Sequence, residues 1–239
     1  MYREIKKKLL ILENRKPFPP EIKTYIEEVS FHDWIYSSLH LDGSAVSKQD
    51  VIKIMKGEFV VSVNLMEHSQ IRNYMEAIRK IYLLKDMKYE LDEKLLIQIF
   101  KVLFPEESEI YRTNNPVLLE LCYNPPHFKE IEEQMELLFG WMNEEIISNP
   151  IRKAAYLHNK IIEIYPFGPH SASMARMALL CDLIQHGFPP ISLAMSESQY
   201  NDALCHYLKT EEIEPFYQVV ERGVYNQLEV MLQLTSPYR

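Results

Sequence analysis

Apolar residues recur at helical spacing along most of the chain. Within residues 69–84, Ile71, Tyr74 and Ile78 lie three or four positions apart, which is the periodicity of one helix face. Polar residues occupy most of the intervening positions, so one side of each such helix faces solvent. The same spacing predicts two short helical pieces within 21–41, a helix beginning around Val51, and helices at 91–103, 128–147, 150–164, 170–186, 196–208 and 213–233.

Residues 109–124 interrupt the helical pattern. They contain two short stretches with strand-like composition, 109–112 and 117–123, around a polar turn at 113–116, which is the arrangement of a β-hairpin. No long linker rich in Ser, Gly or Pro divides the chain. The sequence therefore predicts an all-α fold, a helical bundle carrying one small β-hairpin, with residues 1–239 forming a single domain.

Composition and charge narrow the class of protein. The chain has 26 Lys and Arg against 34 Asp and Glu, a net charge of −8, which does not favour a broad attraction to nucleic acid or anionic lipid. Its three cysteines are far apart in the sequence and indicate neither a disulfide framework nor a zinc site. No apolar stretch approaches the length of about 18 residues that a membrane span needs, and the charged start lacks a secretory signal. We expect a cytoplasmic protein without a nucleic-acid or membrane partner.

One segment stands out as a candidate site. The chain has no HExxH, G-x-S-x-G, Walker A or G-x-G-x-x-G motif, so the common hydrolase and nucleotide-loop chemistries are unsupported. Within 161–176, however, a helix, a Pro–Phe turn and a second helix follow one another directly, and Pro169 suits a first helical turn. Backbone N–H groups there, with the hydroxyls of Ser171 and Ser173, are suited to hold an anion.

The segment 165–176 resembles the signature of the Fic (Fido) family, whose frame is H-P-F-x-(D/E)-G-N-G-R-x-x-R. Aligned without a gap, Pro166, Phe167 and Arg176 match that frame. The resemblance spans about residues 30–210 and implies the helical fold of the family. It includes an earlier helix (73–78), the flap hairpin and the helix after it (111–113, 123–126, 139–143), the helix before the signature (149–164) and the region that follows (187–191, 200–204).

The segment 31–44 resembles the autoinhibitory helix of the family, whose motif is (S/T)-x-x-x-E-(G/N). Ser38 and Gly43 match this motif, and Asp42 takes the place of the glutamate. In the family, that glutamate pairs with the last signature arginine and blocks productive seating of the nucleotide γ-phosphate. The resemblance therefore predicts an ion pair between Asp42 and Arg176. The alternative is that Asp42 and Gly43 merely end a helix or form a turn.

The substitutions in the signature alter the chemistry that the resemblance implies. Active family members transfer AMP from ATP to a hydroxyl of a target protein, with the histidine as base and the acidic residue on Mg²⁺. Here Tyr165 takes the place of the histidine, and a phenol with a pKa of about 10 keeps its proton at neutral pH. Pro169 replaces the acidic residue and offers no metal ligand, so no metal site is predicted. The remaining candidates are Tyr165 and His170 as catalytic groups, and Ser171, Ser173 and Arg176 as nucleotide- or anion-binding groups.

The combined losses argue against ordinary AMP transfer. We predict a Fic-like protein with a degenerate, catalytically impaired site that uses no cofactor and binds a protein partner or an anionic ligand. Tyr111, Arg112 and Thr113 are interpreted as the β-edge of the flap, where a partner peptide would add a strand. One alternative is a divergent but active AMP transferase that modifies protein hydroxyls and requires ATP and Mg²⁺. Another is a structural module that forms homo-oligomers.

Overall fold

The computed structural model describes residues 1–144 and 149–236, and the backbone in these ranges is predominantly helical, as predicted. Three short 3-10 helices lie between the longer elements: η1 (Leu119–Leu121), η2 (Phe128–Glu130) and η3 (Gly168–His170). The α-helices are α1 (Tyr2–Asn14), α2 (Pro20–Leu41), α3 (Lys48–Met55), α4 (Leu65–Asp86), α5 (Glu93–Leu103), α6 (Ile131–Glu144), α7 (Pro150–Ile164), α8 (Ser171–Gln185), α9 (Glu197–Thr210) and α10 (Glu214–Leu234).

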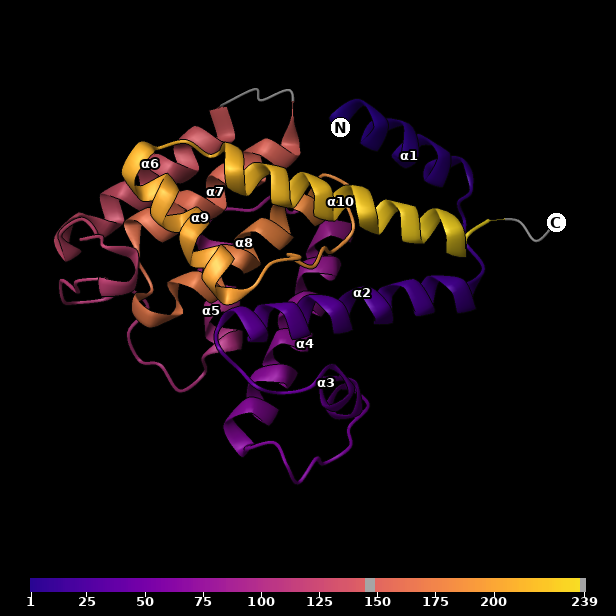
Figure 1. The fold of residues 1–239 in the computed structure, drawn as a ribbon, viewed down its shortest axis with the longest axis horizontal. Coiled ribbons are helices and arrows are strands. Elements are labelled where there is room, and N and C mark those ends of the chain that lie inside the picture. Colours follow the sequence, from indigo (N-terminus) through magenta and orange to yellow (C-terminus); the bar gives the residue numbers. More distant parts are fainter. Residues whose placement is uncertain (145–148, 237–239) are drawn as a thin grey trace.

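Helix α8 lies at the centre of the bundle (Figure 1). Every residue from Ser173 through Ile184 is buried, because this helix carries apolar residues all round rather than on one stripe. Helix α7 packs along it, and α4 and α5 contact it as well. The amphipathic α7 buries Ile151, Leu157 and Ile161 among others. The hydrophobic core thus forms around the two helices that flank the candidate site.

The first and last described helices, α1 and α10, lie side by side (Figure 1). The sequence patterns did not predict α1. Its buried residues, Ile5 and Leu12, are about two helical turns apart, so the apolar stripe is thin. Beyond α1, the guanidinium of Arg15 donates to the carbonyl oxygen of Leu232 at 2.6 Å and to the hydroxyl of Thr235 at 3.0 Å. These contacts fix the start of the chain to the end of α10.

Helix α2 is continuous, whereas the sequence predicted two short pieces within 21–41. No Gly or Pro interrupts this stretch, and the hydroxyl of Ser30 bonds to the carbonyl oxygen of Ile26 at 2.7 Å, so it is satisfied within the helix. The helix ends where Gly43 adopts a φ of 79°, a conformation that glycine tolerates best. Ser38, one turn before the end of this helix, is buried.

The predicted β-hairpin at 109–124 is not formed in the part of the chain that the structure describes. A single antiparallel bridge joins Leu118 and Tyr123, and η1 fills the turn between them. The first predicted strand instead approaches the turn after α7, where the amide of Arg112 donates to the carbonyl oxygen of Pro166 at 2.9 Å. The two segments bond to different partners and therefore do not pair with each other.

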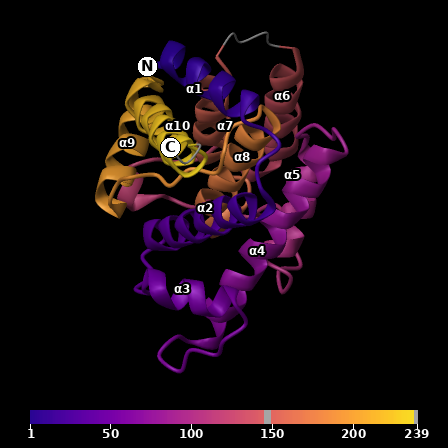
Figure 2. The ribbon, with the colours of Figure 1, turned by 90° about the vertical axis from the view of Figure 1, so that its right-hand side faces the viewer.

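Shorter elements lie at the periphery of the bundle. Figure 2 shows α3 at the end of the molecule opposite α1 and α6. Ser47 caps α3, because its hydroxyl accepts a hydrogen bond from the amide of Asp50 at 3.2 Å. Among the described helices, none combines the length and apolar character needed to cross a membrane.

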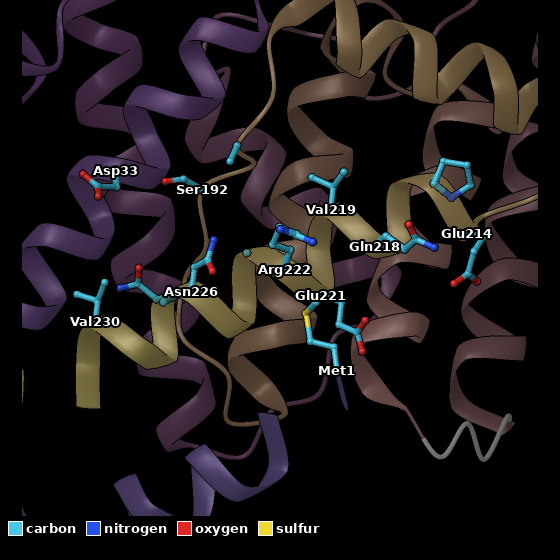
Figure 3. Close-up of a pocket in the computed structure, with 14 residues that line it drawn as sticks. Met1, Asp33, Ser192, Glu214, Gln218, Val219, Glu221, Arg222, Asn226 and Val230 are labelled. Atoms are coloured by element: carbon cyan, nitrogen blue, oxygen red, sulfur yellow. The ribbon is translucent and has the colours of Figure 1, made fainter. Parts of the chain in front are cut away.

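A cavity of about 640 Å³ lies against α10, and Figure 3 shows Gln218, Arg222 and Asn226 around it. Met1 and Ser192 line it from other parts of the chain. None of the candidate site residues from the sequence is among its described lining residues. The signature-like residues therefore lie outside this cavity.

Candidate functional site

A tight turn joins α7 to α8 and carries the signature-like residues. Helix α7 ends because Tyr165 adopts a left-handed conformation, with φ 52° and ψ 48°, and its amide donates to the carbonyl oxygen of Ile161 at 2.9 Å. Gly168 also has a positive φ, of 56°. The buried hydroxyl of Ser171 accepts a hydrogen bond from the amide of Phe167 at 3.0 Å. The turn is thus held by its own hydrogen bonds.

A cavity of about 1210 Å³ opens beside this turn. Tyr165, His170 and Ser173 line it from the signature segment, and its other walls come from the end of α2, the start of α4, the end of α5, η1 and α9. Among its described lining residues there is no Lys or Arg. The acidic lining residues are Asp42, Glu106, Glu107, Glu120 and Glu197.

The guanidinium of Arg176 is buried behind this lining and bonded to the end of α2. The residue is 2% exposed, and its Nη2 atom lies 2.5 Å from Oδ2 of Asp42. Its Nε atom donates to the hydroxyl of Ser38 at 2.8 Å, and Nη2 also donates to the Ser38 carbonyl oxygen at 3.3 Å. The hydroxyl of Ser173 donates to the same Asp42 oxygen at 2.9 Å. The predicted ion pair between Asp42 and Arg176 is present.

Electrostatics favour the charged form of Arg176. Burial disfavours the charge, but the carboxylate of Asp42 and the side chains of Tyr200 and Tyr74 outweigh it and raise the pKa of Arg176 above its ordinary value. The guanidinium also lies over the ring of Tyr200, 5.6 Å from its centroid, a cation–π distance. The positive charge of Arg176 is therefore neutralised by Asp42 inside the protein, and Arg176 is not among the residues that line the cavity.

Replacing Asp42 with alanine is expected to lower the free energy of unfolding by about 2–3 kcal/mol, because it leaves a buried guanidinium without its carboxylate. The Asp42 side chain is 25% exposed, so water compensates for part of the loss. Urea unfolding monitored by circular dichroism measures the effect. The double variant Asp42→Ala/Arg176→Met is expected to lose less than the sum of the two single variants. Additive losses would show that the two side chains do not stabilise each other.

The two candidate catalytic groups line the cavity but are engaged differently. The side chain of Tyr165 is half-buried, and burial raises its pKa above the ordinary value. The ring of His170 stacks on Phe104 with centroids 3.9 Å apart, and its Nε2 atom lies 3.0 Å from a carboxylate oxygen of Glu107. In the described structure no hydrogen bond links Tyr165 to His170, so they do not form an acid–base pair.

Arg112 does not form the strand edge that the sequence predicted. Its residue exposure is only 8%, and its guanidinium donates to backbone carbonyl oxygens at the end of α7 and in the segment after 112: Tyr165 (2.9 Å), Ile164 (3.3 Å), Asn114 (2.6 Å) and Pro126 (2.5 Å). Carbonyl groups in the last turn of a helix lack partners within that helix and carry its partial negative charge. Hydrogen bonds from Arg112 therefore connect the signature turn to the loop that was predicted as the flap.

The neighbours of Arg112 divide between interior and surface. The hydroxyl of Tyr111 donates to the carboxylate of Glu93, and its ring lies 5.6 Å from that of Phe167. Thr113 is exposed. Of the three residues predicted as the flap edge, Tyr111 and Arg112 support the turn from within, and Thr113 alone is exposed.

Comparison with known proteins agrees with this geometry. Residues 90–181 match the model of the Fic/DOC family. The chain is similar to this family over those residues. It is 23% identical over 225 residues to "Protein adenylyltransferase Fic" from Nematostella vectensis, an alignment that covers 91% of this chain and 52% of the relative. It is 22% identical over 198 residues to "Protein adenylyltransferase fic-1" from Caenorhabditis elegans, covering 79% of this chain and 39% of that protein.

Solved structures of Fic proteins share the fold. A Fic domain containing signaling protein from Bacteroides thetaiotaomicron superimposes with a TM-score of 0.85 at 18% identity, covering 98% of this chain and 97% of that one. Fic-1 from C. elegans gives a TM-score of 0.82 at 18% identity, covering 97% and 70%. The chain spans about half or less of the length of the curated relatives above. The comparison establishes the Fic fold for this chain.

The residues at the Fic signature do not fit a magnesium ion. Pro169 occupies the acidic position and has no side-chain oxygen. Of the two nearby acids, Glu163 accepts hydrogen bonds from Lys160 and from the hydroxyl of Tyr207, and the buried Asp182 lies near His186, 3.6 Å from its Nδ1 atom. Neither of these acids lines the cavity. In the described residues, no group of three or more His, Cys, Asp or Glu side chains could hold a metal ion.

The structure adds residues to the candidate site that sequence reasoning did not select. His158 is completely buried between Tyr200, whose hydroxyl lies 2.8 Å from Nε2, and Asn159, whose side-chain oxygen lies 2.9 Å from Nδ1. Tyr200 in turn contacts Arg176 and lines the cavity. In the sequence, His158 lies three residues before Ile161 within a helical pattern. That position gives no sign of its contacts with Tyr200 and Asn159. The glutamates of the cavity lining were also missed, because no motif joins them.

Proposed function

We propose that this Fic-fold protein has lost AMP-transfer chemistry and acts by binding a protein partner at the signature cavity. The supporting observation is the charge of the cavity. Its described lining contains five carboxylates and no Lys or Arg, while Arg176 is buried and paired with Asp42. A nucleotide phosphate needs cationic side chains, backbone N–H groups or a metal ion around it. Carboxylates instead repel phosphate and favour a cationic or neutral ligand.

The signature residues support the loss of catalysis. A general base needs a pKa near the working pH, and burial moves the pKa of Tyr165 further above that range. His170 is hydrogen-bonded to Glu107 and stacked on Phe104, and it lies five positions after Tyr165, which takes the place of the family histidine. Ser173, which replaces the signature arginine, donates a hydrogen bond to Asp42. This substitution strengthens the inhibitory contact instead of supplying a phosphate ligand.

The same charges favour one of the two ligand classes that the sequence left open, a protein partner or an anionic ligand. An anionic ligand would have to displace Asp42 from Arg176 and from Ser173 before it met a positive charge. A protein segment can use the apolar part of the lining and the carboxylates without breaking that contact. We therefore favour a protein partner, in the cytoplasm, without ATP or Mg²⁺ and without nucleic acid or membrane.

An active AMP transferase remains the second candidate function. The curated relatives are named protein adenylyltransferases, and the contact between Asp42 and Arg176 is the one that blocks nucleotide seating in the family. Release of Arg176 by Asp42→Asn would then create an ATP site. This candidate makes a prediction opposite to that of the binding protein.

The deciding experiment is calorimetric titration with ATP, with and without Mg²⁺, on the wild-type chain and on the Asp42→Asn and Arg176→Ala variants. We expect no heat of binding from wild type or Asp42→Asn at millimolar ATP, and no transfer of labelled AMP to protein. Circular dichroism verifies that each variant is folded. Binding by wild type or Asp42→Asn that is lost in Arg176→Ala would overturn the proposed function and establish a nucleotide site.

A further inference from the structure

We propose that the partner enters the signature cavity with a basic, amphipathic peptide segment, whose apolar side chains pack against the rim and whose Lys or Arg side chains meet the cavity glutamates. This inference rests on the proposed function and specifies the chemistry of the partner. It follows from two features of the cavity lining that lie next to each other: an exposed apolar rim and a set of unpaired carboxylates.

Four large apolar residues of the lining are exposed to solvent: Leu65 (71%), Met66 (80%), Val117 (63%) and Leu119 (80%). They come from the start of α4 and from the loop around η1, on elements that both border the cavity. Scattered exposed apolar residues need no explanation, but several that border one cavity are typical of an interaction site. A small cation that bound only to the carboxylates would leave these four apolar side chains exposed to solvent.

The acidic lining supplies the second feature. Glu106 follows α5, Glu120 lies in η1 and Glu197 begins α9, so three separate elements direct carboxylates to one cavity. All three residues are exposed, and none has an ion-pair partner among the described residues. Asp42 and Glu107 are engaged with Arg176 and His170. The cavity therefore presents negative charge that no side chain of the described protein neutralises.

The size and dispersion of these groups favour a peptide over a smaller cation. The cavity volume of about 1210 Å³ exceeds that of typical small-molecule pockets, which reach about 1,000 Å³. The glutamates are spread over three elements, and no metal-binding cluster occurs in the described residues. An amphipathic peptide places apolar and charged side chains on adjacent faces, which matches the combination of rim and carboxylates. Long Lys and Arg side chains can also cover apolar surface while keeping their charge near the glutamates.

A displayed library of random 12-residue peptides tests this inference on the full chain. The counter-selection uses the triple variant Glu106→Lys/Glu120→Lys/Glu197→Lys. A matched control, Glu58→Lys/Glu133→Lys/Glu136→Lys, changes the net charge equally at exposed glutamates outside the cavity. We expect the enriched peptides to carry net positive charge together with Leu, Ile, Phe or Met. By fluorescence anisotropy, they should bind the cavity variant at least tenfold more weakly than wild type, and the control within about twofold.

Other results would overturn the inference. Neutral or acidic peptides among the enriched sequences would do so, as would equal loss in the cavity and control variants or no enrichment over the counter-selected variant. Leu119→Asn adds an independent check on the apolar rim, because Leu119 is exposed and a neutral polar replacement should weaken peptide binding without changing the charge of the cavity or unfolding the protein. The ATP titration distinguishes a failure of the proposed function from a failure of the peptide proposal. ATP binding overturns the proposed function, whereas absence of both ATP and peptide binding overturns the peptide proposal alone.

Discussion

Replacing Arg112 with methionine is expected to lower the free energy of unfolding by about 3–5 kcal/mol, because several backbone carbonyl groups lose a charged hydrogen-bond donor at once. The guanidinium donates to four backbone carbonyl oxygens, two of them at the end of α7. Methionine fills much of the same space but donates nothing, so the buried carbonyl group of Ile164 and the part-buried one of Tyr165 lose their donor. Urea unfolding of the full chain measures the loss.

The variant Arg112→Lys separates charge from geometry. Lysine keeps the positive charge but presents a single ammonium group instead of a planar fork, so it can satisfy only some of the four carbonyl groups. We expect its stability to lie between that of wild type and Arg112→Met. A methionine variant within about 1 kcal/mol of wild type would mean that Arg112 contributes no more than an ordinary surface residue. Lysine restoring full stability would show that charge alone is sufficient.

Arg112 also shows where sequence reasoning fails and why. Composition correctly indicated helices, and the spacing of apolar residues located α4, α5, α7, α8, α9 and α10 closely, because each helix buries a face or stripe that is visible locally. The strand prediction at 109–112 relied on composition alone. A polar side chain whose partners lie some fifty positions later, such as Tyr165, leaves no periodic trace. The tertiary contact decided the conformation instead.

The residues of the candidate site were likewise predictable only in part. The pair between Asp42 and Arg176, separated by 134 positions, was predictable only from the resemblance to the Fic family, since both residues lie within recognisable motifs. The glutamates of the cavity belong to no motif. Glu106 and Glu197 converge only because the end of α5 and the start of α9 meet at one cavity. The sequence thus indicated the contact between Asp42 and Arg176, whereas the structure was needed to find the carboxylates that line the cavity.

The His158→Gln variant is expected to remove a pH-dependent loss of stability. Burial, and to a smaller extent the charge of Arg176, lower the pKa of His158 to about 3, against an ordinary value of 6.5. Between these two pH values the unfolded chain binds a proton that the folded protein excludes, so stability falls as the pH decreases from 6.5 towards 3. The full shift corresponds to a loss of at most about 4–5 kcal/mol. Glutamine is neutral throughout and retains donors and acceptors for Tyr200 and Asn159.

Urea unfolding of wild type and His158→Gln at intervals from pH 8 to pH 4 measures this effect. At pH 8 the variant should be less stable, because it loses the stacking of His158 on Phe216, and this deficit should shrink as the pH falls below 6.5. Asp182→Asn provides a matched control of opposite sign. Burial raises the pKa of Asp182 to about 6 from 3.8, so this carboxyl group destabilises the folded state as the pH rises through 6, and the asparagine variant should gain relative stability there. A His158→Gln deficit that is constant with pH would show that His158 is protonated equally in the folded and unfolded states, and would contradict its burial as a neutral ring beside Arg176.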